Sequence, residues 1–68
     1  MDRKTFGIAL RKARVAKNLT QTQLAKKAGF TMRAVQYWEQ GAKNITLENS
    51  AKLLDALGME ITIQDKPA

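Results

Sequence analysis

The strongest constraint on the fold is the placing of helix-capping and helix-ending residues, which divides the chain into four short segments that each begin and end like a helix. Ser, Thr and Asp open helices because their side-chain oxygens accept hydrogen bonds from free backbone N–H groups, and Gly or Asn closes them. The openings and closings are Asp2 and Asn18, Thr20 and Gly29, Thr31 and Gly41, and Thr46 and Gly58. The sequence therefore predicts helices over about residues 3–17, 21–28, 32–40 and 47–57.

The second segment has the best-defined start. Gln23 follows the cap Thr20 by three positions, which is the spacing of a capping box, and Leu19 and Leu24 have the spacing of a hydrophobic staple. Apolar residues at helical spacing predict the buried sides of the four helices. The predicted core residues are Phe6, Leu10, Ala13, Leu24, Ala25, Ala28, Val35, Trp38, Leu47, Ala51, Leu54 and Leu57.

The second and third segments are joined by a tight turn at Gly29 and Phe30. Ala25 is small, as a closely packed neighbouring helix requires. Two short helices joined in this way are typical of a helix-turn-helix unit, whose second helix lies in the major groove of DNA. We therefore expect an all-α domain of four short helices.

The third segment has one apolar and one polar side. With 100° per residue, Val35 and Trp38 fall on one side. The opposite side carries Arg33, Gln36, Tyr37 and Gln40. Arg can bind guanine and Gln can bind adenine through paired hydrogen bonds, so this side suits base reading. The alternative is that these residues form an ordinary solvated helix face.

Four residues outside this polar side also bear on DNA contact. Gln21 begins the second helix, where free backbone N–H groups favour phosphate, or it is simply solvated. Lys43 is either a second phosphate anchor or a solubilising charge. Glu39 falls close to the apolar side and needs a cation, since an unpaired buried carboxylate is costly. Arg14 is the best candidate by position, and an Arg held there could also touch phosphate.

Charge and composition narrow the class of function. The net charge is +6, and residues 1–43 carry ten Lys or Arg against two acids, which predicts a polyanionic partner. The chain has no Cys and no His, so it offers no thiolate or imidazole for a metal site or for catalysis, and we expect neither an enzyme nor a cofactor. No membrane span or signal peptide is apparent, which predicts a cytoplasmic protein.

The residues of the turn and its flanks resemble the Cro/lambda-repressor type helix-turn-helix, or XRE, family. The resemblance covers about residues 6–58 and rests on LTQTQLA at 19–25, AGFT at 28–31, Val35, WE at 38–39, Gly41 and ALG at 56–58. It implies operator binding, with Gln21 on phosphate and an Arg14–Glu39 pair between the first and third helices. It also implies base-reading positions at Thr31, Met32, Arg33, Gln36 and Tyr37. The sequence departs from the family pattern at two places. Ser50 stands where the family usually has a large aliphatic residue, and residues 59–64 stand where many relatives have a fifth helix that makes the dimer.

The spacing of apolar residues changes at residues 59–64 from the helical pattern to a strict alternation. Met59, Ile61 and Ile63 alternate with polar residues, which predicts a half-buried β-strand, followed by a flexible tail at 65–68. A lone strand needs a partner, and the same strand of a second subunit would supply it, with Met59, Ile61 and Ile63 as the dimer interface. The alternative is that this segment docks on the first and fourth helices. Residues 1–58 would form the DNA-binding domain.

These features together predict a sequence-specific transcriptional regulator that binds double-stranded DNA. We expect a repressor that binds a palindromic operator as a homodimer. The alternative is an antitoxin that binds DNA and neutralises a toxin protein. General nucleic-acid condensation is a further possibility, and it predicts binding without sequence preference.

Overall fold

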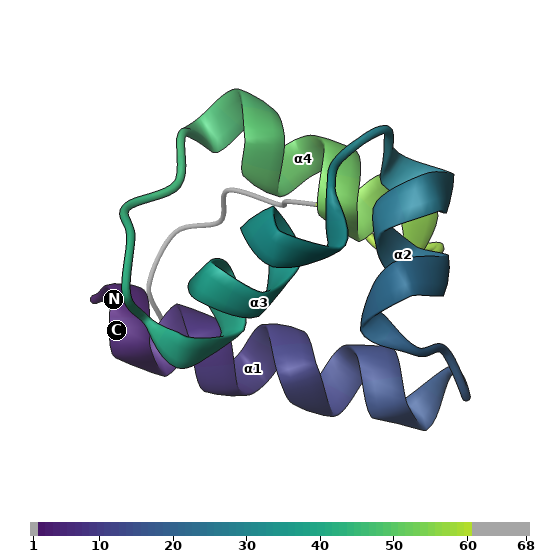
Figure 1. Cartoon of the computed structure of the whole chain (residues 1–68), viewed down its shortest axis with the longest axis horizontal. Helices are drawn as coiled ribbons and strands as arrows, with labels where there is room; N and C mark the ends of the chain where they lie inside the picture. Colours follow the sequence, from purple (N-terminus) through teal and green to yellow (C-terminus); the bar gives the residue numbers. More distant parts are fainter. Residues whose placement is uncertain (1, 61–68) are drawn as a thin grey trace, which may run out of the picture.

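In the computed structural model, which describes residues 2–60, the chain folds into four α-helices joined by short turns (Figure 1). They are α1 (Arg3–Ala16), α2 (Gln21–Ala28), α3 (Met32–Gln40) and α4 (Leu47–Ala56). The predicted helices are confirmed, with α1 and α4 each ending one residue earlier than expected. In the view of Figure 1, α1 lies along the bottom and α4 along the top, with α3 in the centre. Helix α3 packs against both α1 and α2, and α4 packs against α2.

Each helix begins at its predicted cap. The side chains of Asp2, Thr31 and Thr46 each accept a hydrogen bond from the backbone N–H three residues later, at 2.8, 3.1 and 3.0 Å. Thr20 forms the full capping box, because Gln23 Oε1 also accepts from the Thr20 N–H at 2.8 Å. Substituting such caps typically costs about 1 kcal/mol each, so the helix starts are strongly specified by local sequence.

The core lies among the four helices, and each of them contributes to it. Leu10, Leu24, Val35 and Leu53 are fully buried, one from each helix. Phe30, from the turn before α3, packs edge-to-face on Trp38 with ring centroids 4.9 Å apart, a favoured aromatic geometry. The predicted burial of Leu10, Leu24, Val35 and Trp38 is confirmed.

The predicted buried side of α4 is wrong by about one residue. Leu47 is 72% exposed and Ala51 is exposed, whereas Ser50, Leu53 and Ala56 are buried. The predicted burial of Leu57 is confirmed, and Leu54 is half-buried. Ser50 can face the core because its Oγ donates a hydrogen bond to the Thr46 carbonyl at 2.9 Å, which satisfies the buried hydroxyl. The prediction followed the apolar residues Leu47, Ala51 and Leu54, and it left out Ser50 because a hydroxyl appeared unsuited to the core.

Gly7 allows α1 to approach α3 closely. A Cβ at this position would lie 2.5 Å from the Trp38 carbonyl oxygen and 2.6 Å from that of Glu39. Both are backbone atoms, which cannot move aside as a flexible side chain can. The missing side chain of Gly7 is therefore a packing requirement of the fold.

The predicted strand is absent from the part of it that the structure describes. Met59 and Glu60 lie in no strand, and the Met59 N–H donates to the Leu54 carbonyl at 2.8 Å as part of the turn that closes α4. This bond uses the donor that a strand pairing would need at Met59. Ile61 and Ile63, the rest of the predicted strand and the predicted tail at 65–68 lie outside the described residues.

Within residues 2–60 no helix is long and apolar enough to cross a membrane. The same residues contain no cluster of acidic side chains that could hold a metal ion.

Candidate nucleic-acid interface

Helix α3 has a buried side and an open polar side. Val35, Trp38 and Glu39 are buried, while Arg33 and Gln40 are exposed and Gln36 and Tyr37 are half-buried. The division predicted from the helical wheel is confirmed. Glu39 is the one acid in α3 and it points inward, so the open side presents a guanidinium, two amides and a phenol without a carboxylate that would repel phosphate.

The residues at the start of α3 are also accessible. Thr31 is exposed, and its hydroxyl oxygen accepts from the Ala34 N–H, so the hydroxyl proton remains free to donate. Met32 is 42% exposed and offers only apolar contact, for example to a thymine methyl group. Thr31 and Met32 therefore lie at the same end of α3 as Arg33.

The turn between α2 and α3 fixes their relative position. Gly29 has φ of +83°, in the left-handed region that glycine adopts most readily. The N–H groups of Gly29 and Phe30 both donate to the Ala25 carbonyl, at 2.9 and 2.8 Å. With Ala25 itself fully packed in the core, α3 leaves the turn in one defined direction.

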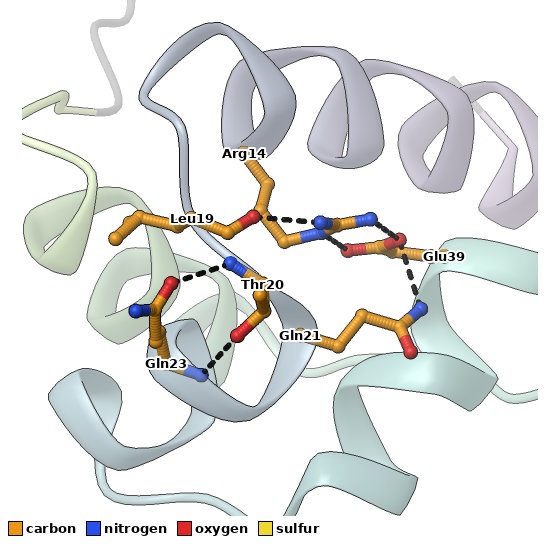
Figure 2. Close-up of polar contacts among 6 residues, drawn as sticks. All are labelled: Arg14, Leu19, Thr20, Gln21, Gln23 and Glu39. Carbon is orange, nitrogen blue, oxygen red and sulfur yellow. Dashed lines mark hydrogen bonds and ion pairs between the residues drawn. The ribbon is translucent and has the colours of Figure 1, made fainter.

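Arg14 and Glu39 form the predicted pair, which joins α1 to α3 (Figure 2). Arg14 Nε lies 2.6 Å from Glu39 Oε2, and Nη2 lies 3.0 Å from Oε1, so the fork of the guanidinium meets both carboxylate oxygens. The side chains are only 12% and 3% exposed. The hydrogen bond to Glu39 raises the pKa of Arg14 above its ordinary value, so the guanidinium stays charged at neutral pH.

Two further contacts extend this pair into α2. Arg14 Nη1 donates to the Leu19 carbonyl at 2.7 Å, and Gln21 Nε2 donates to Glu39 Oε1 at 3.1 Å (Figure 2). Gln21 was expected to bind phosphate or to be solvated, and its bond to Glu39 was missed. The result is a network that connects α1, the following turn, α2 and α3 around one buried carboxylate.

A small pocket opens beside this network. It is lined by Arg11, Arg14, Gln21, Gln36, Glu39 and Gln40. Arg11 was not among the predicted site residues, although it lies three positions before Arg14 and so on a neighbouring part of the same helix face. The structure thus brings Arg14, Gln21, Gln36 and Gln40 together at one place on the surface.

Lys43 lies beyond the end of α3, next to Tyr37. Its Nζ atom is 4.6 Å from the centroid of the Tyr37 ring, within the range of a cation–π contact. Lys43 is exposed and Tyr37 is half-buried. The predicted phosphate anchor and the predicted base reader are therefore direct neighbours, which the sequence did not indicate.

Comparison with known proteins also identifies a helix-turn-helix fold. A family model described as helix-turn-helix matches residues 10–64. The restriction-modification controller protein C.AhdI from Aeromonas hydrophila has a TM-score of 0.85 and 41% identity, over 87% of this chain and 86% of that chain. The clp gene regulator ClgR from C. glutamicum has a TM-score of 0.84 and 30% identity, over 87% of this chain and 76% of that chain.

A third similar structure covers more of the chain. A protein in the HipA-HipB-O2-O3 complex has a TM-score of 0.83 and 27% identity, over 98% of this chain and 94% of that chain. No curated protein gave a significant match.

Proposed function

Since the chain belongs to the Cro/lambda-repressor type helix-turn-helix family and is a DNA-binding transcription regulator, we propose that it acts as a repressor that reads a palindromic operator as a homodimer. In this proposal α3 lies in the major groove, and its open side contacts the edges of the bases. Arg33 has the fork geometry that recognises guanine, and Gln36 and Gln40 have the amide that recognises adenine.

The observation that carries the proposal is that buried hydrogen bonds hold α3 in a fixed position against α1 and α2. Base reading requires side chains held at a defined angle to the groove, and the Arg14–Glu39–Gln21 network ties α3 to α1 and α2 through buried hydrogen bonds. A solvated helix face has no need of such support. The open side of α3 also lacks any acid, as contact with a polyanion requires.

Phosphate contacts would surround the base contacts. Gln21 begins α2, where the free N–H groups of the first turn favour an anion, and its amide has a second N–H besides the one that bonds Glu39. Lys43 would contact phosphate at the other end of α3. Arg14 donates to Glu39 and Leu19 and is largely buried, so we assign it mainly to holding α3 and only secondarily to phosphate.

A palindromic operator has two equal half-sites, so the proposed repressor binds it as a homodimer with one subunit on each half-site. Two recognition helices of one repressor bind half-sites about 34 Å apart, or one helical turn of DNA. We propose that Met59, Ile61 and Ile63 contribute to the contact between subunits, since Met59 is 45% exposed at the end of α4. Sedimentation of a chain truncated after Gly58 tests this assignment. A truncated chain that remains dimeric would rule it out.

A second candidate function is that of an antitoxin that binds DNA and also neutralises a toxin. It is favoured by the similarity over 98% of the chain to a protein solved within the HipA-HipB-O2-O3 complex. The test is co-expression with the product of the adjacent gene. A stable stoichiometric complex that relieves growth inhibition by that product would favour this candidate over a dedicated repressor.

The direct test of the proposed function is fluorescence-anisotropy binding to the DNA upstream of the protein's own gene and to a scrambled duplex, at two salt concentrations. We expect preference for the upstream DNA that persists at the higher salt, because base contacts depend less on counterion release than phosphate contacts do. Equal and strongly salt-dependent binding to both duplexes would instead indicate condensation without sequence preference.

A further inference from the structure

The end of α3 folds back so that Lys43 lies beside the last turn of the helix. Gly41 has φ of +68°, and its N–H donates to the Trp38 carbonyl at 3.2 Å. The Ala42 N–H then reaches back to the Tyr37 carbonyl at 2.9 Å. This second bond holds the backbone just before Lys43 against Tyr37, the residue whose ring the Lys43 ammonium covers.

The reversal is also packed against α1. A Cβ at Gly41 would lie 2.9 Å from Lys4 Cα, so the turn is in close contact with the backbone of the first helix. Gly41 is buried, whereas Ala42 and Lys43 are exposed. The backbone before Lys43 is therefore fixed, and the side chain extends from it along the surface.

The ring of Tyr37 holds the ammonium group without neutralising it. Nζ of Lys43 lies 4.6 Å from the ring centroid, and the two ion pairs among the described residues involve other side chains. An ammonium paired with a carboxylate would have to release it before binding phosphate. An ammonium held by an uncharged ring keeps its full charge, and its remaining N–H groups can bind phosphate while the ring contact persists.

We infer that Tyr37 is a positioning residue whose ring holds the Lys43 ammonium at the end of α3, where it contacts a phosphate of the DNA backbone. This inference rests on the proposed function and changes one assignment within it. Tyr37 was expected to read bases, and its hydroxyl would be the atom that does so. In the inferred role the aromatic ring is required and the hydroxyl is not, and the contact is independent of base sequence.

The test uses the full chain and a duplex of scrambled sequence, because phosphate contacts do not require the operator. Binding is measured by anisotropy over a series of salt concentrations for wild type, Lys43→Gln, Tyr37→Leu, Tyr37→Phe and the Tyr37→Leu/Lys43→Gln double variant. Lys52→Gln is the control for loss of one positive charge, since Lys52 lies on α4, which carries none of the proposed DNA contacts, and already pairs with Glu48. We expect Lys43→Gln to reduce the slope of log K against log salt by about 0.9, as loss of one phosphate contact does, and Lys52→Gln to leave it unchanged.

Tyr37→Leu should weaken binding about two- to five-fold, the change that corresponds to losing a surface cation–π contact. Tyr37→Phe should bind like wild type because it keeps the ring. The double variant should bind no more weakly than Lys43→Gln alone, because both changes remove one coupled contact. Multiplying losses in the double variant, or equal losses for Tyr37→Phe and Tyr37→Leu, would overturn the inference.

A second measurement keeps the inference testable if Tyr37→Leu fails to fold. The ε-methylene protons of Lys43 should show an upfield ring-current shift in the NMR spectrum of wild type and of Tyr37→Phe. Unshifted protons in both would overturn it. Failure of the proposed function is distinguishable, because wild type itself would then bind no duplex at low salt or would bind the upstream and scrambled duplexes equally. An unchanged salt slope for Lys43→Gln in a chain that prefers the upstream duplex contradicts this inference alone.

Discussion

Arg14 and Glu39 lie 25 positions apart in the chain, yet their side chains meet through two hydrogen bonds of 2.6 and 3.0 Å at the contact of α1 with α3. Since the Glu39 side chain is 3% exposed, its charge depends on Arg14 and Gln21 for compensation. This relationship fixes the orientation of the helix that carries the proposed base-reading residues.

Replacing Glu39 by Gln should therefore destabilise the protein strongly. The variant keeps the shape of the side chain but leaves the guanidinium of Arg14 largely buried without its counter-charge, and removing one partner of a buried pair typically costs about 3–5 kcal/mol. Urea unfolding followed by circular dichroism measures the loss. The control is Glu48→Gln, which breaks the exposed i,i+4 pair with Lys52 and should change stability by less than about 1 kcal/mol. Equal effects of the two substitutions would contradict the structural role assigned to Glu39.

Gly7→Ala should destabilise the protein, even though alanine is the better helix former by about 1 kcal/mol. The added methyl group would meet the carbonyl oxygens of Trp38 and Glu39 at 2.5 and 2.6 Å and push α1 away from α3. Overpacking of this kind costs about 1–3 kcal/mol, and here the opposing atoms belong to the backbone. Thermal unfolding provides the measurement, and Ala9→Gly on the exposed side of α1 gives the effect of helix propensity alone. A more stable Gly7→Ala variant would show that α1 and α3 are not in close contact at this point.

The stability of the α1 start should depend on pH through Asp2. The Thr5 N–H donates to its carboxylate and lowers the pKa of Asp2 below 3.8. A carboxylate with a lowered folded-state pKa contributes stability above its unfolded pKa and loses that contribution as the pH falls through the folded value. The difference in unfolding free energy between wild type and Asp2→Asn, which caps without titrating, should therefore shift against wild type as the pH falls from about 5 to 2. A difference that stays constant over this range would argue against the cap.

Gln21→Ala should weaken binding to preferred and scrambled DNA by the same factor, because a phosphate contact carries no sequence information. It should also lower stability by about 1 kcal/mol through loss of the bond from Gln21 Nε2 to Glu39. Anisotropy titrations with both duplexes and an unfolding curve separate the two effects. A loss confined to the preferred duplex would assign Gln21 to base reading instead.

Most of the helix boundaries could be predicted because the signals are local. A cap such as Thr20 and a stop such as Gly29 act on backbone groups within four residues, so no tertiary information is needed. The two sides of α3 followed from its strong separation of apolar from polar residues, and the Arg14–Glu39 pair from the cost of burying a lone carboxylate.

The features that could not be predicted depend on contacts that the apolar and polar pattern of the sequence does not describe. Gly7 appeared only as a weak helix former, because its clash partners at Trp38 and Glu39 come from another helix. Ser50 appeared unsuited to the core, since its hydrogen bond to the Thr46 carbonyl forms only in the folded helix. The Lys43 contact with Tyr37 depends on the chain reversal at Gly41, which no periodicity describes.

The central claim is that the open side of α3 reads base sequence, and Arg33 tests it most directly. The measurement compares wild type and Arg33→Ala on the preferred duplex, selected from a random pool, and on a scrambled duplex at the same salt concentration. We predict a loss of about 1–3 kcal/mol on the preferred duplex with a much smaller loss on the scrambled one, because removing a base contact relaxes sequence preference. Equal losses on the two duplexes would contradict the claim, since Arg33 would then contact only the phosphate backbone.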